Sequence, residues 1–466
     1  MPAPADRYRE FFHTVLGDSV AERPALKHWG QSMPELDLQS LWYAGEFGTE
    51  FTTVDGQRLA IRDFGVWNHA AGPDFTGCAL QLNGKTLKGD IELDPDARDW
   101  ERHGHGANPN YEQVVLHLFL HQPEARVFTR TAGHREVLQV YLTPDMLKSN
   151  ARPQLLAEAR LGRCSTPLRH MPEAAVGSLL EAAAQYRLQR KSERLHALVR
   201  LHGREQAVYQ SLAAALGYRN NQRPFTILAQ RLPLRTLLKR DATERESLLF
   251  GVSGFLESVR YEDTEPETRT YLRQLWSTWW KQREAYAEWL LPPNQPVWQI
   301  AGARPGNHPQ RRLGALSAVL ENWKQVFAPL REVAAWDRKR FVKILLDLKH
   351  DYWSQHYTLL AAPAAKALAL IGASRAQEIL ANLAYPLLVP EDERLWMDYK
   401  DLPAVLDNQK VRRAALRLFG AETTADLFQK RLFQQQGLLQ IYEDYCLEDD
   451  SSCEDCPFPE RLKQWQ

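Results

Sequence analysis

Acidic side chains gather around one predicted β-hairpin within the first hundred residues of the chain. Asn83 and Gly84 are neighbours that both accept a positive φ, so they predict a tight two-residue turn between two strands. The outgoing strand places Glu92 and Asp94 on one face, and Asp74 precedes the incoming strand. Carboxylate oxygens are ligands that Mg²⁺ or Mn²⁺ prefers, and such a metal activates water for phosphodiester hydrolysis. The sequence therefore predicts a divalent-metal site.

Two further side chains belong to this hypothesis. Lys88 lies on the same strand face as Glu92, four residues upstream, where it would supply a cation for the charge that develops on phosphate. Glu35 shares one face of a predicted helix over residues 34–47 with Gln39 and Trp42. The expected catalytic residues are Asp74, Glu92, Lys88 and Glu35, and the expected metal ligands are Asp74, Glu92 and Asp94.

The register of the hairpin decides whether these carboxylates meet. Around a two-residue turn at Asn83-Gly84, strict pairing sets Asp74 opposite Leu93, on the face away from Glu92. A single bulge at Gly77, or pairing that ends before Pro73, would return Asp74 to the face of Glu92. The alternative interpretation is a hairpin with one solvated, charged face.

Histidines follow the hairpin in two settings. His103 and His105 stand in a glycine-rich stretch after Asp99-Trp100, and with a carboxylate they could bind a transition metal, because neutral imidazole suits zinc and iron. In the nuclease hypothesis they would instead contact phosphate or position water. His117 lies in the apolar run 114–120, where a hydrogen-bonded core histidine is the simplest interpretation.

Three cysteines close the chain within eleven positions, namely Cys446, Cys453 and Cys456. A tetrahedral Zn²⁺ site or a 4Fe-4S cluster needs four ligands, and Cys164 is the candidate for the fourth. Cys78 is expected on the apolar face of the hairpin instead. Such a site would fasten the tail beside Cys164; the alternative is an acidic tail without metal.

A local excess of positive charge follows in residues 185–245, which hold thirteen Lys and Arg against four acidic residues. Lys and Arg supply most of the affinity for nucleic acid, so this block predicts a phosphate-facing surface, for DNA rather than RNA. The alternative is a solvated helical surface that is balanced elsewhere. The expected nucleic-acid-binding residues are Arg187, Arg190, Lys191, Arg194, Arg219 and Arg223.

The composition bounds these hypotheses. The 466 residues carry 58 Lys and Arg against 58 Asp and Glu, with 44% hydrophobic residues and five cysteines. This predicts two or three soluble domains and excludes a disulfide scaffold. No run approaches the ~18 apolar residues of a membrane span and no signal peptide is evident, so a cytoplasmic protein is expected. Motifs for nucleotide hydrolysis, dinucleotide binding and the serine-hydrolase elbow are missing from the sequence.

The pattern of the chain changes near residue 150, which predicts an α+β fold. Residues 1–150 are expected to form a mixed domain with a central antiparallel or mixed sheet, residues 151–440 a helical domain, and residues 441–466 the cysteine-rich tail. The expected strands are 50–54, 58–64, 76–82, 85–94, 113–121, 125–130 and 136–142. The expected helices are 177–201, 205–216, 248–259, 270–290, 311–332, 338–346 and 377–383.

Short motifs along the chain also carry a family resemblance. They are Glu35-x-x-x-Gln39-x-x-Trp42, Ala71-Gly72-Pro73-Asp74-Phe75, Gly89-Asp90-Ile91-Glu92, Asp99-Trp100-x-x-His103-x-His105, Val115-Leu116-His117, Arg304-Pro305-x-Asn307-x-Pro309-x-x-Arg312 and Ile371-Gly372. Over nearly its whole length the chain resembles the uncharacterised bacterial family called domain of unknown function 2851, which implies no established activity.

The hairpin itself is similar to the PD-(D/E)xK nuclease arrangement, through Pro73-Asp74 and Glu92-x-Asp94. This resemblance implies a nuclease-like fold with Mg²⁺ at Asp74 and Glu92. Asp94 departs from it, because the nuclease motif has lysine there and members of the 2851 family usually have histidine; Lys88 would be a migrated lysine.

Three functions are therefore expected, in this order. The first is a metal-dependent nuclease, and the second is a nucleic-acid-binding protein on a degenerate nuclease fold, favoured if Asp74 faces away from Glu92. The third is a histidine-metal hydrolase unrelated to nucleic acid, indicated by a metal at His103 and His105.

Overall fold

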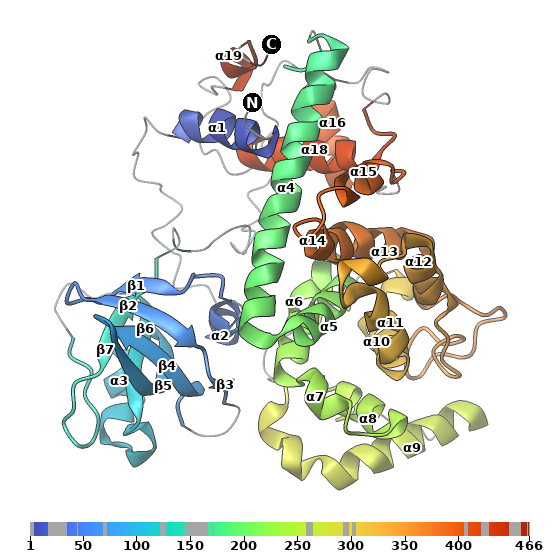
Figure 1. The fold of residues 1–466 in the computed structure, drawn as a ribbon. Helices are drawn as coiled ribbons and strands as arrows, with labels where there is room; N and C mark the ends of the chain where they lie inside the picture. The colour runs from blue at the N-terminus through green and yellow to red at the C-terminus, as the bar shows by residue number, and fades with distance from the viewer. Residues whose placement is uncertain are drawn as a thin grey trace.

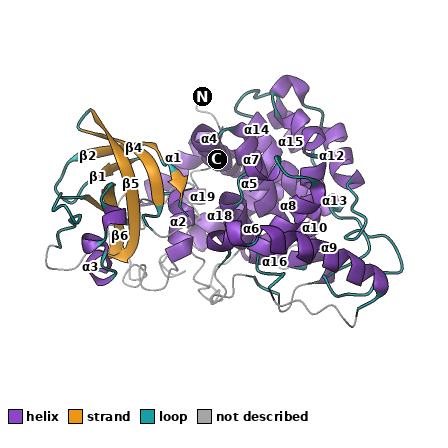
Figure 2. Cartoon of the chain, turned by 90° about the horizontal axis from the view of Figure 1, so that it is seen from below, coloured by secondary structure: helices purple, strands orange, loops and turns teal. Residues whose placement is uncertain are grey.

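The described residues form a mixed β-sheet and a large helical region (Figure 1). The predicted α+β class is therefore confirmed. The computed structural model describes residues 4–16, 35–43, 45–68, 72–121, 127–143, 146, 166–169, 171–257, 264–291, 298–300, 304–404, 409–420, 428–446, 458–463 and 465. Seen from below, the strands stand on one side and most helices on the other (Figure 2).

The sheet of the described residues has the strand order β1-β2-β4-β5-β6-β7, with β3 paired to β4. Pairing is antiparallel from β1 to β5 and parallel from β5 through β6 to β7, so the sheet is mixed. The expected strand at 125–130 is reduced to a single bridge between Arg130 and Glu136 within the residues described there. The strands are β1 (Glu50–Thr52), β2 (Arg58–Asp63), β3 (Val66–Trp67), β4 (Phe75–Leu82), β5 (Lys85–Asp96), β6 (Val114–His121) and β7 (Leu138–Tyr141).

The hairpin of β4 and β5 turns where the sequence predicts it. Asn83 and Gly84 have φ values of 47° and 84°, and Leu82 pairs with Lys85 across the turn. These positive φ values are what a two-residue turn with the twist of its strands requires.

A bulge then shifts the register of this hairpin by one residue. Cys78 pairs with Gly89, but Phe75 pairs with Ile91, so Thr76 and Gly77 together face one position of β5. Gly77 has a φ of 70°, the left-handed conformation that glycine adopts without strain. Strict pairing is therefore wrong beyond Cys78, and Asp74, one residue before Phe75, lies on the face of Glu92.

Helix α2 (Glu35–Tyr43) packs on the sheet and holds its amino terminus over β5. Its Trp42 is fully buried, with its ring centroid 5.3 Å from that of Phe51 and 5.2 Å from that of Phe64. Burial of large aromatic side chains supplies most of the free energy that fixes such a helix. Ile227 and Leu291 of the helical region join the same core, so the sheet and the helices are continuous.

The helical region is organised around α4, which runs from Glu173 to His202 (Figure 1). A second core joins α5, α6, α8 to α10 and α12 to α14. Within the described helices none is long and apolar enough to cross a membrane. The remaining helices are α3 (Asp99–Arg102), α5 (Arg204–Leu216), α6 (Tyr218–Arg231), α7 (Leu234–Leu237), α8 (Ala242–Val252), α9 (Pro266–Gln282), α10 (Pro309–Glu321), α11 (Trp323–Phe327), α12 (Arg338–Asp347), α13 (Ala373–Ile379), α14 (Tyr385–Leu388), α15 (Leu395–Lys400) and α16 (Gln409–Phe419), with α1, α18 and α19 below.

The two ends of the chain meet on α4. Helices α1 (Pro4–Leu16), α18 (Leu432–Cys446) and α19 (Phe458–Leu462) share one apolar core with the first turns of α4. The Tyr8 hydroxyl also donates to Asp444 Oδ2 at 2.8 Å. Helix α1 thus packs with the helical region, through Tyr8 and Phe12, although residues 1–150 were expected to form the mixed domain.

Three of the four cysteines of the predicted metal site, Cys164, Cys453 and Cys456, lie outside the described residues. Cys446 ends α18, and its side chain is not described either. Cys78 is buried, and its thiol lies 3.2 Å from the carbonyl oxygen of Phe64, on the apolar side of the hairpin as expected. A zinc or iron-sulfur site at the four other cysteines stays a prediction.

Replacing Gly77 tests the bulge. An added Cβ would meet no atom within 4 Å, so Gly77→Ala costs only the left-handed backbone conformation, about 1–2 kcal/mol in the free energy of unfolding. Gly77→Asn should cost less, because asparagine tolerates this conformation. Urea unfolding measures both variants, and an alanine variant as stable as the parent chain would contradict the bulge.

Candidate metal centre

The site forms where β5 ends and the chain crosses to the parallel strand β6. Helix α3 and the short 3-10 turns η2 (His105–Ala107) and η3 (Pro109–Tyr111) make this crossing. This crossing brings His103 next to Asp94 and His105 next to Glu92, and Glu35 of α2 lies close enough to Asp94, His103 and His105 to interact with them electrostatically.

Asp74 and Glu92 are locked together by backbone hydrogen bonds. The Asp74 amide donates to Glu92 Oε2 at 3.0 Å, and the Leu93 amide donates to Asp74 Oδ2 at 3.1 Å. Each carboxylate thus binds the backbone beside the other, which follows from the bulge that aligns their residues. The structure brings together the first two predicted ligands.

Gln39 connects Asp74 to Glu35. Its amide Nε2 lies 2.6 Å from Asp74 Oδ1 and 3.0 Å from Glu35 Oε1, and the residue is buried. The amide group can donate one hydrogen to each carboxylate, so it holds two negative groups in place without neutralising them. Gln39 was not among the predicted site residues, although its spacing of four from Glu35 on one helix face was the signal for it.

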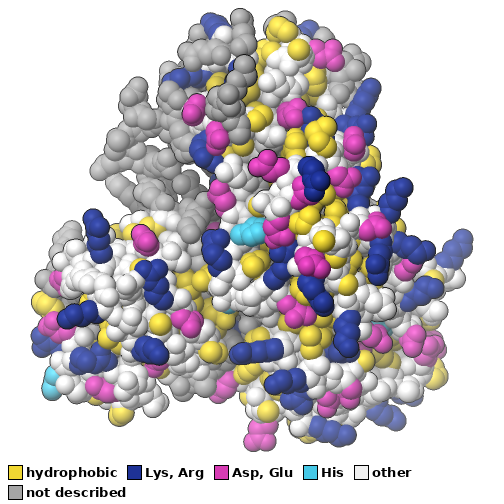
Figure 3. Space-filling model, viewed as in Figure 1, with side chains coloured by type: hydrophobic (Ala, Val, Ile, Leu, Met, Phe, Trp, Pro, Cys, Tyr) yellow, Lys and Arg dark blue, Asp and Glu magenta, His cyan; other side chains and the backbone are white. Residues whose placement is uncertain are grey.

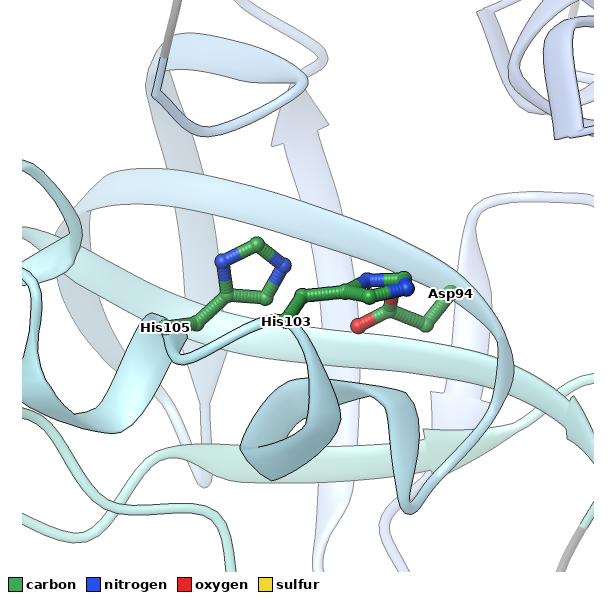
Figure 4. A group of neighbouring side chains, drawn as sticks. All are labelled: Asp94, His103 and His105. Atoms are coloured by element: carbon green, nitrogen blue, oxygen red, sulfur yellow. The ribbon is translucent and has the colours of Figure 1, made fainter.

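Asp94, His103 and His105 form a compact group of donors (Figure 4). One ligand atom from each lies within 4.8 Å of the others, and His103 Nδ1 is 3.3 Å from Asp94 Oδ1. His105 Nε2 lies 3.2 Å from Glu92 Oε1, but it is buried and has no hydrogen-bond partner within the described structure. A buried imidazole nitrogen beside carboxylate oxygens is a donor set with which a transition-metal ion can bind.

His117 contacts Asp94 and is not one of the three grouped donors. Its Nε2 lies 3.1 Å from Asp94 Oδ2, and its Nδ1 lies 2.8 Å from Thr129 Oγ1, which accepts from Gln139 at 2.7 Å. Both ring nitrogens of the fully buried His117 therefore have hydrogen-bond partners, and the residue orients Asp94.

Three carboxyl groups of the site have raised pKa values, and no Lys or Arg among the described residues pairs with them. Burial raises the pKa of Asp74 well above its usual value, and Glu92 beside it adds to the shift. The pKa of Glu92 is raised in the same way, by burial and by Asp94, and that of Glu35 is raised as well. Among the described residues, no Lys or Arg pairs with Glu35, Asp74, Glu92 or Asp94. Burial also lowers the pKa of His105, which leaves the imidazole neutral and able to bind metal.

The expected lysine is not part of this arrangement. Lys88 is exposed and pairs with Ala79 across the hairpin. Four residues along a strand separate its Cα from that of Glu92 by about 13 Å, and within the described structure it contacts none of the four carboxylates.

Most of the predicted phosphate-binding cations on α4 face inward instead. Arg187 Nη1 lies 2.5 Å from Glu443 Oε2, and the Lys191 amine donates to Asn382 and Gln436 at 2.7 and 2.8 Å. Glu443 of α18 thus pairs with the charge of Arg187, while Lys191 binds two neutral amides, and a phosphate-facing role for these residues stays a prediction. Arg190 lies 3.9 Å from Asp444, Arg194 lies 3.1 Å from Glu46, Arg223 is half-buried, and the Arg219 side chain is outside the described set.

Substitutions of the buried carboxylates test these pKa shifts in metal-free protein. A raised pKa means that the folded state binds more protons than the unfolded state, so the free energy of unfolding falls as pH rises above about 4, the usual carboxyl pKa. Each group contributes at most about 1.4 kcal/mol per pH unit to this fall. Asp74→Asn and Glu92→Gln should therefore flatten the decline between pH 4.5 and 7.5.

Urea unfolding with a chelator present measures the effect. Glu136→Gln is the matched control, because Glu136 is exposed and pairs with Arg130. A decline of equal slope in all four proteins would contradict the assignment of raised pKa values to Asp74 and Glu92.

Comparison with known proteins gives one match. The family model described as protein of unknown function (DUF2851) matches residues 35–399, which include the whole site but not α1, α18 or the closing cysteines. A search of curated proteins and a search of solved structures gave no match.

Proposed function

Since the chain belongs to the DUF2851 family, whose function is unknown, its activity has to be argued from the site, and we propose that it is a metal-dependent phosphodiesterase acting on nucleic acid. The observation that carries this proposal is the group of four neighbouring carboxylates with a buried His105 Nε2 that has no hydrogen-bond partner among the described residues.

The donor set indicates which ions fit. Two imidazoles and several carboxylates combine nitrogen and oxygen donors, which suit Mn²⁺, Zn²⁺ or Fe²⁺ better than Mg²⁺ alone. Asp94, His103 and His105 would hold one ion, with Glu92 beside them. Asp74 and Glu92 remain the pair for a Mg²⁺ or Mn²⁺ ion, as the sequence suggested.

The chain's own residues define how such a site would work. A bound divalent ion would supply activated water and a positive charge for the phosphate oxygens. His117 and Gln39 hold Asp94 and Asp74 at fixed positions, so the charged groups need no rearrangement. His103, with 45% of its side chain exposed, and Glu35 mark the open side from which substrate enters.

The order of elements supports a phosphodiester substrate. A helix with Glu35 precedes the sheet, Asp74 and Glu92-x-Asp94 flank a hairpin, and a helix leads from β5 to the parallel strand β6. This order is similar to the PD-(D/E)xK arrangement to which the motif pointed. The lysine of the nuclease motif is replaced by Asp94 here, so this site would act without a lysine at that position.

A second candidate is a histidine-metal hydrolase that does not act on nucleic acid. It is favoured by the imidazole donors and by Asp94, which stands where a nuclease lysine is expected. The two candidates share the metal centre and differ in substrate. Cleavage of oligonucleotides would support the nuclease, and activity confined to small esters would support the hydrolase.

Hydrolysis assays test the first proposal. With Mn²⁺ or Mg²⁺ the protein should cleave single- or double-stranded DNA or RNA, and also the small diester bis(p-nitrophenyl) phosphate. Glu92→Gln should lower kcat by about 100-fold or more, because it removes a preorganised charge from the site. Glu136→Gln should act like the parent chain. Equal rates for Glu92→Gln and the parent chain would remove the proposal.

Metal binding is tested separately by thermal unfolding. A ligand that binds only the folded state at 100 times its Kd stabilises it by about 2.7 kcal/mol. Mn²⁺ or Zn²⁺ should therefore raise the Tm of the parent chain, and His105→Ala should lose most of that rise. His134→Ala is a control outside the donor group. A rise that persists in His105→Ala would place the ion elsewhere.

A further inference from the structure

One flank of α9 carries aromatic and basic side chains in a line. Residues 269, 273, 276, 280 and 283 follow one another at alternating steps of four and three, the spacing of a continuous stripe on a helix. In order they are Arg269, Arg273, Trp276, Trp280 and Arg283. The stripe lies beside the buried line of Leu272, Leu275 and Trp279, which anchors the helix in the core.

The indoles of the stripe form an exposed stack. The rings of Trp276 and Trp280 are 5.1 Å apart with an interplanar angle of 15°, and Trp280 is 58% exposed. Trp276 packs partly on the helical core, which holds the pair in place. The exposed face of Trp280, backed by a second indole, is an aromatic surface on which a planar ligand can stack.

Cations flank this stack, and the only acid within α9 itself is Glu267 in its first turn. Between residues 268 and 283 the chain has Arg269, Arg273, Lys281 and Arg283 and no Asp or Glu. Arg269 donates to the Thr264 carbonyl at 2.8 Å, and Arg283 lies over the Trp280 ring at 5.4 Å from its centroid and pairs with Glu257. Arg273 and Lys281 are exposed. Lys and Arg side chains stand out on the lower part of the helical region, where α9 runs (Figures 1 and 3).

We propose that this flank of α9 is a stacking platform for single-stranded nucleic acid. Bases of any sequence stack on exposed indoles, and Arg and Lys beside them bind the backbone phosphates. From Arg269 to Arg283 the stripe is about 21 Å long, the length of about six stacked nucleotides. The inference rests on the proposed function only for the class of substrate. It assigns nucleic-acid binding to α9, whereas the sequence predicted it for residues 185–245.

Fluorescence anisotropy of the full chain with a labelled twenty-residue oligo(dT) tests the platform. Trp280→Ala should weaken binding by about 5- to 150-fold, and Trp280→Phe should keep most of the affinity, because a phenyl ring still stacks. Arg273→Ala should lower the slope of log K against log salt by about 0.7. Phe128→Ala is the control, since Phe128 is an exposed ring with Arg130 beside it but lies on the sheet side of the chain and not on α9.

Hydrolysis of bis(p-nitrophenyl) phosphate separates this inference from the proposed function. That substrate is too small to need α9, so Trp280→Ala should hydrolyse it at the parental rate. Oligonucleotide binding that depends on Trp280 supports the platform even in a protein that cleaves nothing. Unchanged affinity in Trp280→Ala, or a parent chain that does not bind the oligonucleotide, overturns it. Loss of a dimer in Trp280→Ala, seen by sedimentation with affinity unchanged, would overturn it in favour of self-association.

Discussion

The one-residue bulge at Gly77 is the constraint on which the candidate site depends. Without it, strict pairing from the Asn83-Gly84 turn would set Asp74 on the opposite face from Glu92. The left-handed φ of Gly77 takes up the extra residue, and its amide donates to Asp90 at 3.0 Å. Because side chains alternate along a strand, a single residue decides whether two carboxylates meet or point apart.

Once the carboxylates meet, their charge governs the rest of the site. Buried negative groups without a Lys or Arg partner among the described residues destabilise the metal-free fold, and the surrounding structure has to hold them. The burial of Trp42 fixes α2, and α2 brings Gln39 to Asp74. On the other side, the buried His117 fixes Asp94. A fold that holds acidic groups together at a cost in stability is typical of a site built for a cation.

Local sequence patterns predicted the turn and the strands, but they could not predict contacts between residues far apart in the chain. The Asn83-Gly84 turn and the strands around it were predicted because turn chemistry and alternation act over a few residues. Helix α6 was missed, since Pro224 inside it is a helix-breaking signal. The inward role of Arg187 was missed because its partner, Glu443, is more than 250 residues away in the chain. The bulge was identified only as one of two ways to bring Asp74 and Glu92 together.

The most direct test of the account is to locate the ion itself. Crystals of the full chain grown with Mn²⁺ and measured for anomalous scattering should show a peak about 2.0–2.3 Å from His105 Nε2, with Asp94 and His103 as further ligands. The same peak should vanish in crystals of His105→Ala. A peak elsewhere in the chain, or no peak with His105 Nε2 still unbound, would contradict the metal centre on which the proposed activity depends.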